Sequence, residues 1–299
     1  RAAKMVSSGI TSARDLGGGR WLELEIRDRI LAGDLTGPRL ICAGQPVTSP
    51  QGHCHFWGGE AADADEAKQV IARQIDHGVD LIKVMATGGN LTKGSRPADA
   101  QFDVETLSTM VSLSNNHDLG VAAHCHGTEG IRNAADAGVT TIEHCSWVND
   151  EGWARGFDND VAGTIAERGI RVSPTVNLGW KRRIGSGDYE RLVQETFPRL
   201  KSAGATLIAS TDAGIPGVYH HDLPRALPVF AHFAGLSPVE ALRAATSDCA
   251  DAIGLGAITG RIASGYSADL LLLESDPLSD LAALDRSAEV WARGSKVNG

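Results

Sequence analysis

Short apolar runs alternate with segments of helical spacing along most of the chain. In the clearest stretch, residues 121–147, an apolar run ends on His124, a segment with helical spacing follows and stops at Gly138, and a second β-branched run ends on His144. This order predicts a strand, a helix and a second strand. The connection is long enough for a right-handed crossover, so we expect the two strands to be parallel neighbours whose carboxyl ends open onto the same face.

The same alternation predicts the other elements. Strands are expected over residues 9–15, 38–43, 80–85, 170–175 and 206–210, and helices over residues 21–32, 63–77, 104–117, 160–168, 189–203, 223–234 and 238–249. Alternating strands and helices are typical of a parallel α/β fold, and their number favours a closed (β/α)₈ TIM barrel. An open doubly wound sheet is the alternative. It is disfavoured because no G-x-G-x-x-G motif opens a helix after the first strand.

The pattern changes near the C-terminus, where short strands with tight turns are predicted over residues 268–274, 290–294 and 296–298. A length of 299 residues with 42% hydrophobic content suits one barrel-sized domain with a small appendage. We therefore expect a TIM barrel over residues 1–260 and the C-terminal part of a small β-sandwich over residues 261–299.

Charge and hydropathy exclude several classes of partner. The net charge of −9 argues against nucleic acid and anionic membrane surfaces. A mean hydropathy of −0.12 and the absence of an apolar run near ~18 residues predict no membrane span. The expected partner is a small-molecule substrate. The sequence leaves the oligomeric state open, a homo-oligomer included.

The cysteines indicate neither a disulfide framework nor a zinc ribbon, because the five are odd in number and form no C-x-x-C pair. Cys125 and Cys145 each follow a histidine by one residue, which on a strand points them to the opposite side, so we interpret them as packing residues. No signal peptide pattern is present, and a cytoplasmic location is the prediction.

Four polar residues stand at predicted strand ends. His124 and His144 end the strands described above, Lys83 lies inside an apolar run, and Asp212 precedes a glycine-rich loop. A single histidine after a strand is more often a core or rim residue than a ligand. Lys83 could instead pair its ammonium with Asp80 or Asp212. Four such residues at four strand ends nevertheless favour a shared metal site.

The sequence resembles the metal-dependent amidohydrolase superfamily, most closely its imidazolonepropionase-like and prolidase-like dipeptidase branch. The resemblance spans nearly the whole chain and is carried by the order and spacing of short motifs. These are Gly52-His53, Asp80-Leu-Ile-Lys83-Val with Thr87-Gly-Gly89, Ala123-His124-Cys-His-Gly127, Ile142-Glu-His144, Ser173-Pro-Thr175, Ser210-Thr-Asp212-Ala-Gly214, Ala244-Ala-Thr-Ser247 and Gly265-Tyr-Ser-Ala-Asp269-Leu.

The resemblance implies a metal site built on Lys83. In the family, a lysine at this position reacts with CO₂ to give a carbamate, an anionic ligand able to bridge two cations. His124 and His144 would bind one metal with the carboxylated Lys83, and Asp212 would ligate the other metal and move protons. Zn²⁺ is the expected ion, one or two per chain, with other divalent metals as alternatives.

The resemblance also implies roles for residues around that site. His126 occupies the position that helps to polarise the scissile carbonyl, and His53, Tyr219 and His220 lie on loops that would contact the substrate, with exposed loop residues as the alternative interpretation. We expect Arg14, Asp15 and Glu143 to be structural, with hydrogen bonds at strand ends. We expect His77, His117 and His232 to lie on helices that face solvent or neighbouring helices.

One feature departs from the family pattern. Family members begin with sandwich strands and a first barrel strand that ends in a His-x-His metal pair, whereas this sequence starts at Arg1, in the helix that would follow that strand. His53 and His55 share the spacing, but they follow Gly52 and match the family's Gly-Gly-His substrate motif. The expectation is an N-terminal segment that was lost or lies outside the sequence given, or a degenerate member of the family.

The first functional hypothesis is therefore a metal-dependent hydrolase that cleaves a C–N amide bond of a small molecule, such as a dipeptide or an N-acyl amino acid, by a metal-bridging hydroxide. Deamination or opening of a lactam (imidazolone-type) ring is the alternative within the enzyme class. A catalytically degenerate barrel that binds metal or a partner is the alternative outside it.

Overall fold

The computed structural model describes residues 1–297 and contains two parallel sheets and one antiparallel sheet. In the first parallel sheet β1 (Ser12–Asp15) pairs with β2 (Arg39–Cys42). The second has the order β3 (Leu81–Met85), β4 (Gly120–Gly127), β5 (Thr141–Val148), β6 (Arg171–Ser173) and β7 (Thr206–Leu207). Strand order follows chain order in both sheets, which is the order found in a (β/α)₈ barrel and differs from that of an open doubly wound sheet.

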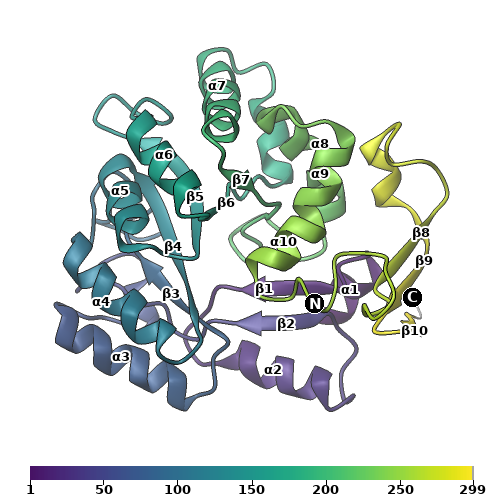
Figure 1. Cartoon of the computed structure of the whole chain (residues 1–299), viewed down its shortest axis with the longest axis horizontal. Helices are drawn as coiled ribbons and strands as arrows, with labels where there is room; N and C mark the ends of the chain where they lie inside the picture. The colour runs from purple at the N-terminus through teal and green to yellow at the C-terminus, as the bar shows by residue number, and fades with distance from the viewer. Residues whose placement is uncertain (298–299) are drawn as a thin grey trace.

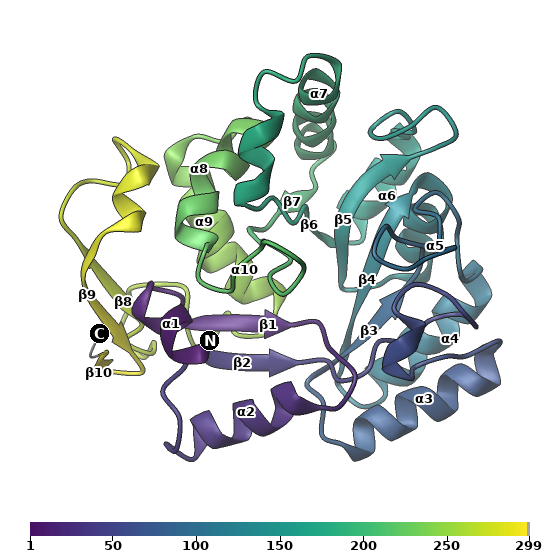
Figure 2. The ribbon, with the colours of Figure 1, turned by 180° about the vertical axis from the view of Figure 1, so that it is seen from behind.

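The two parallel sheets join through the chain that follows β2. Val47 forms an isolated parallel bridge with Val84, and its backbone donates to the Lys83 carbonyl and accepts from the Met85 amide, both at 2.8 Å. The strands therefore form one continuous arc (Figures 1 and 2). Within residues 1–297 no pairing links β7 to β1. The α/β fold with a parallel sheet is confirmed, and closure into a barrel stays a prediction.

Helices alternate with these strands, and α2 to α6 lie on the outside of the arc (Figures 1 and 2). The α-helices are α1 (Ala2–Ser7), α2 (Leu22–Leu31), α3 (Ala64–Asp76), α4 (Val104–Asn115), α5 (Thr128–Ala137), α6 (Asn159–Glu167), α7 (Asp188–Ser202), α8 (Leu223–Ala234), α9 (Pro238–Ala245) and α10 (Ser247–Ala252). Short 3₁₀ helices cover η1 (His55–Trp57), η2 (Leu178–Arg183) and η3 (Leu281–Asp285).

Several predicted elements differ from the observed ones. The strands expected to end at His124 and His144 continue to Gly127 in β4 and to Val148 in β5. The helix expected over residues 238–249 is two helices, because Thr246 leaves helical geometry at φ −127° and ψ −94°. The strand expected over 170–175 ends at Ser173, since Pro174 has no amide hydrogen to donate. The strand expected over 206–210 is regular only to Leu207, although the amide of Ile208 still donates to the Val172 carbonyl at 2.8 Å.

The core lies between the strands and the helices that cover them. Every residue of β3 is buried, and most of β4 and β5 is buried too, as expected for parallel strands covered on both faces. On α5, Ile131, Ala134 and Ala135 are fully buried. Two small alanines on this face allow the helix to approach the sheet closely, which fixes the strand ends that carry His124 and His144.

The C-terminal strands form a separate antiparallel sheet in the order β10 (Ser295–Lys296), β9 (Ser287–Ala292) and β8 (Leu270–Leu273). The buried Asp269 side chain ties this sheet to β2, because it accepts from Arg39 at 3.2 Å and from the Arg293 amide at 2.8 Å. Asn298, in the strand predicted over 296–298, lies outside the described residues. The sheet fits the predicted appendage, and the boundary at residue 260 remains a proposal.

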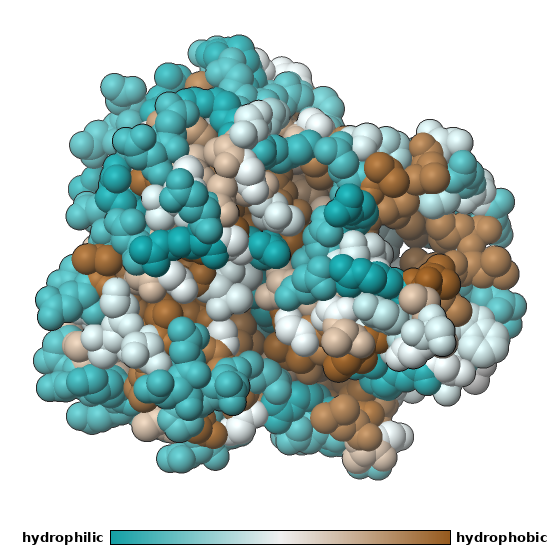
Figure 3. Space-filling view, viewed as in Figure 1, coloured by the Kyte–Doolittle hydropathy of each residue, from teal (hydrophilic) through white to brown (hydrophobic). Residues whose placement is uncertain are grey.

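Figure 3 shows apolar side chains gathered over the C-terminal strands, at the right of the view, while most of this face is hydrophilic. Exposed residues of this region include Leu272 at 56% and Ile262 at 91%. None of the described helices is both long and apolar enough to cross a membrane.

Candidate active site

Four histidines meet at the carboxyl ends of β4 and β5. His124 and His126 come from β4 and His144 from β5, and one ligand atom from each lies within 4.8 Å of the others. Ring centroids are 4.5 Å apart for His124 and His144 and 4.4 Å apart for His126 and His144. The ring centroid of His53, from the loop after β2, lies 4.6 Å from that of His124. Since His124 and His126 are two apart on one strand, their side chains share a face.

Each of these rings has one nitrogen engaged by a neutral group. The Nε2 atom of His124 lies 3.1 Å from the Gly88 carbonyl. A carbonyl can only accept, so this nitrogen carries the hydrogen and Nδ1 keeps its lone pair. In each of the other three histidines a hydroxyl contacts Nδ1. The Thr175 hydroxyl lies 2.7 Å from Nδ1 of His144. The corresponding distances are 2.9 Å for Ser146 with His126 and 3.0 Å for Thr92 with His53. One nitrogen of each ring is left for a ligand.

The surroundings keep these imidazoles neutral. Burial, with Lys83 adding to it, lowers the pKa of His53 to about 4. Burial, with His53 and Lys83 adding to it, lowers the pKa of His126 to about 3. Burial and then the neighbouring histidines hold the pKa values of His124 and His144 well below the usual range. Neutral imidazole is the form that binds a metal, so the cluster is held in its ligating state near neutral pH.

Lys83 lies on β3 with only 4% of its surface exposed, and within residues 1–297 its ammonium has no hydrogen bond or ion pair. Burial lowers the pKa of its amine, and the Glu143 carboxylate opposes that effect. The alternative in which Lys83 pairs with Asp80 is wrong, because Asp80 accepts from Arg27 and from the Cys42 amide, both at 2.8 Å. The buried amine is therefore biased toward its neutral, nucleophilic form.

Asp212 follows β7 with a left-handed backbone, φ 56°. Its side chain is exposed, yet the protein around it removes enough water to raise the pKa of the carboxyl, and Lys83 opposes that rise. Lys83 lies on the strand next to β4, two residues before Met85, which pairs with His124. The site thus combines neutral nitrogen donors, a buried amine and a carboxylate that solvent can reach.

Residues 1–294 match the amidohydrolase family. The chain belongs to this family. An ochratoxinase of Aspergillus niger is 28% identical to it over 98% of this chain. The crystal structure of a Xaa-Pro dipeptidase with bound methionine in the active site superposes with a TM-score of 0.86 and 25% identity, over 100% of this chain and 77% of that one. The crystal structure of a putative prolidase from Bifidobacterium longum gives a TM-score of 0.81 and 30% identity, over 99% and 74%.

This amidohydrolase chain spans 66% of the length of the ochratoxinase that it matches. The predicted membership of the superfamily and of its prolidase-like branch is confirmed. The family is generally metal-dependent, and the donor set fits that property, since three close imidazoles of nearby strands present neutral nitrogens.

An ion pair crosses the interior of this amidohydrolase beside Lys83. Arg14 of β1 donates to the Glu143 carboxylate of β5 at 2.6 Å and to the Thr141 hydroxyl at 2.9 Å. Burial would raise the pKa of the Glu143 carboxyl, but Arg14, Lys83 and the hydroxyls of Ser173 and Thr141 outweigh it and lower the pKa. Glu143 and Arg14 have the hydrogen bonds expected of structural residues at strand ends.

Two predicted substrate residues lie apart from the cluster. Tyr219 and His220 sit on the loop after β7, where Tyr219 is 62% exposed and its amide donates to Asp222 at 3.2 Å. Within residues 1–297 no hydrogen bond or ring contact joins either of them to the four histidines. Of the helix-associated histidines, His117 is exposed and His232 lies 2.7 Å from Glu190.

The sequence did not reveal the hydroxyl partners Thr92, Ser146 and Thr175. Thr175 lay within a quoted motif, yet no periodic pattern marks a hydroxyl on a loop as a partner of a histidine. Backbone strain marks two positions of the site, but it is visible only in the structure. His144 and Thr175 adopt left-handed φ values of 67° and 56°. Such values are uncommon for residues other than glycine and cluster at functional sites.

Proposed function

We propose that this chain carries the site of a zinc-dependent hydrolase that cleaves a C–N amide bond of a small molecule, a dipeptide or an N-acyl amino acid. The observation that carries the proposal is the cluster of His124, His126 and His144, with ligand atoms within 4.8 Å, on β4 and β5 of the sheet in which β3 carries the buried Lys83. The printed names of the relatives, an ochratoxinase and a Xaa-Pro dipeptidase, support an amide substrate.

Lys83 would serve as a carbamate. Its neutral amine attacks the carbon of CO₂, an N–C bond forms, one C=O π bond opens, and the proton leaves to solvent. The product is an anion with two oxygens, a better partner for a divalent cation than an ammonium. His124 through Nδ1 and His144 through Nε2 would hold the same ion. A bound divalent metal supplies Lewis acidity and lowers the pKa of water.

The other residues would handle protons and substrate. Asp212 is exposed on the loop after β7, and it would accept a proton from water and return it to the leaving amine. Ser146 engages Nδ1 of His126, so the Nε2 atom is left for a ligand and would polarise the scissile carbonyl. His53 would contact the substrate from the loop after β2, and Tyr219 and His220 from the loop after β7.

We expect His124→Ala and His144→Ala each to abolish metal binding and amide hydrolysis, because each removes one nitrogen donor from a small donor set. His117, in the turn after α4, and His232, on α8, make no hydrogen bond or ring contact with the cluster among the described residues, so His117→Ala and His232→Ala should leave metal binding and hydrolysis nearly intact. Metal content after dialysis and a hydrolysis screen of dipeptides, N-acyl amino acids and cyclic amides measure the outcome. Equal losses in all four variants would contradict the assignment and indicate general destabilisation.

The ring of His53 occupies the space that a side chain at position 89 would need. A Cβ at Gly89 would stand 2.5 Å from the Cε1 and Nε2 atoms of the His53 ring. Gly89→Ala should therefore displace the ring and lower kcat by roughly 10- to 100-fold, the cost of a misplacement near 1 Å. Gly163→Ala is the matched control, since nothing lies within 4 Å of its Cβ position on α6. Unchanged kcat in Gly89→Ala would remove His53 from the proposed substrate contacts.

A further inference from the structure

Thr175 contacts the site through a single histidine. Its hydroxyl lies 2.7 Å from Nδ1 of His144, and this is shorter than the other contacts that engage a nitrogen of the cluster. Thr175 is 8% exposed and comes just after β6, while His144 comes from the adjacent strand β5. The contact therefore links two neighbouring strand ends.

The Thr175 hydroxyl is itself held in place. The Thr175 amide donates to the Ser210 hydroxyl at 3.0 Å, and Ser210 lies 2.7 Å from the hydroxyl of the fully buried Ser173. Thr175 keeps a left-handed φ of 56°, which a β-branched residue adopts only under compensation from its surroundings. Three consecutive strand ends, those of β5, β6 and β7, are thus joined by hydroxyl contacts that aim one side chain at His144.

The contact decides which nitrogen of His144 faces the cluster. With Nδ1 against Thr175, the opposite nitrogen Nε2 is left for the side on which His124 and His126 lie, with centroids 4.5 and 4.4 Å away. For Nε2 to keep its lone pair, Nδ1 must carry the hydrogen and donate it to the threonine oxygen. The contact therefore fixes the ring orientation, and a hydroxyl that accepts here supports the tautomer in which Nε2 keeps its lone pair.

We propose that Thr175, held by Ser210, is a positioning residue that sets the ring of His144 for metal binding. The inference rests on the proposed function, because it assigns the role within the same site. The hydroxyl is neutral, so it orients the imidazole without the added basicity that a carboxylate would give. Loss of an outer-shell partner of this kind typically weakens metal affinity by about 10- to 100-fold.

The test compares Thr175→Val with Thr175→Ser in the whole chain. Valine keeps the shape and the β-branching, and with them the backbone strain, but removes the hydroxyl, whereas serine retains the hydroxyl. Apo protein is titrated with Co²⁺ and with Zn²⁺ in competition with a chelator, and the visible spectrum of the Co²⁺ form is recorded. We expect ~10- to 100-fold weaker binding and an altered spectrum for Thr175→Val, and near wild-type behaviour for Thr175→Ser.

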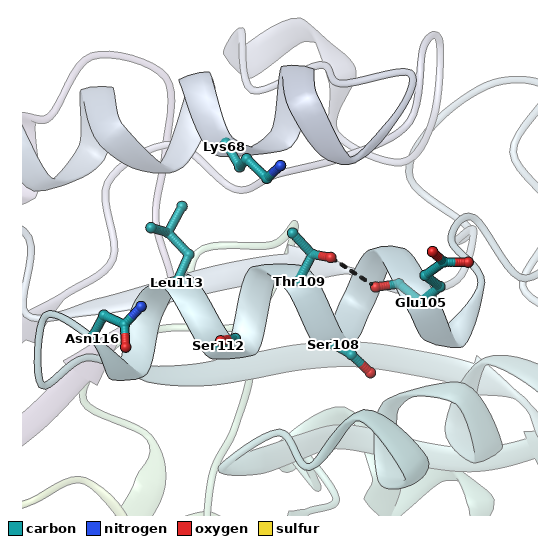
Figure 4. A pocket seen from close by; sticks show the side chains of 7 residues that line it. All are labelled: Lys68, Glu105, Ser108, Thr109, Ser112, Leu113 and Asn116. Carbon is teal, nitrogen blue, oxygen red and sulfur yellow. Dashed lines mark hydrogen bonds between the residues drawn. The ribbon is translucent and has the colours of Figure 1, made fainter.

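Two further variants separate positioning from general effects. Ser210→Ala should weaken binding in the same direction, since it releases the Thr175 amide. Thr109→Val is the control, because its hydroxyl donates to the Glu105 carbonyl at 3.1 Å in a groove between α3 and α4 whose lining includes none of the four histidines (Figure 4). The Tm of each apo protein shows whether a variant folds.

The outcomes are distinct. Co²⁺ affinity and spectrum unchanged in a folded Thr175→Val would overturn this inference alone. An equal loss of metal affinity in Thr175→Val and Thr175→Ser would overturn it too, because the loss would then not come from removal of the hydroxyl. Failure of the wild-type protein to bind either ion would overturn the proposed function together with it.

Discussion

Lys83→Arg and Lys83→Ala should each lower the rate of amide hydrolysis by about 10³-fold or more, the equivalent of roughly 4 kcal/mol of transition-state stabilisation by bound metal. The reason is charge and geometry. A carbamate offers two anionic oxygens, whereas a guanidinium stays cationic in a protein and a methyl group offers no ligand. Turnover of an N-acyl amino acid and metal content after dialysis measure the effect.

Rescue distinguishes the carbamate from a structural lysine. In Lys83→Ala, a short-chain carboxylic acid added with bicarbonate should restore part of the activity, since the space left can admit an anion. Lys83→Glu supplies a carboxylate on a shorter stem, so partial metal binding and weak turnover are expected. A lysine that only supports the fold predicts the reverse order, with arginine tolerated, glutamate harmful and no rescue. Activity like that of the wild type in Lys83→Arg would end the carbamate proposal.

Much of the fold could be predicted from the sequence because its signals are local. Apolar periodicity and end signals located the helices to within a few residues, as at α3, where Asp63 caps the helix by accepting from two amides. The break at Thr246 escaped prediction. Buried alanines lie on both sides of it, Ala244 before and Ala250 after. Gly260 packs so closely that a Cβ there would stand 2.8 Å from the Ala250 side chain and 2.9 Å from the Thr246 carbonyl, a contact between separate segments that local periodicity does not report.

Some residues of the site could also be predicted from the sequence, and others could not. His124, His144 and Lys83 could be predicted as neighbours because parallel strands bring their carboxyl ends together, and no other information was needed. The partners that orient the rings could not, because a hydroxyl on an irregular loop leaves no periodic trace. Thr175 and Thr92 reach the histidines by backbone paths that only the folded chain defines.

The Arg14–Glu143 ion pair could not be predicted from the sequence either, because its members lie 129 residues apart and meet across the interior. We expect Glu143→Ala to lower the free energy of unfolding by roughly 3–5 kcal/mol. The side chains of Arg14 and Glu143 are 9% and 2% exposed, so removal of the carboxylate leaves the guanidinium without its partner in a poorly solvated place. Lys83 also loses the charge that most favours its ammonium.

Charge and packing can be separated by comparing further variants in urea denaturation. Glu143→Gln keeps the shape and part of the hydrogen bonding, so a large loss there would assign the effect to charge. The double variant Arg14→Met with Glu143→Leu removes both charges and should recover most of the stability, because replacing a buried pair by apolar residues is often close to neutral. Glu195→Ala breaks the exposed pair with Arg191, at 2.9 Å, and should cause no measurable change. If Glu143→Ala proved as harmless as Glu195→Ala, the ion pair would not be what holds β1 to β5, and the hydroxyl of Thr141, which Arg14 also reaches, would have to carry that connection.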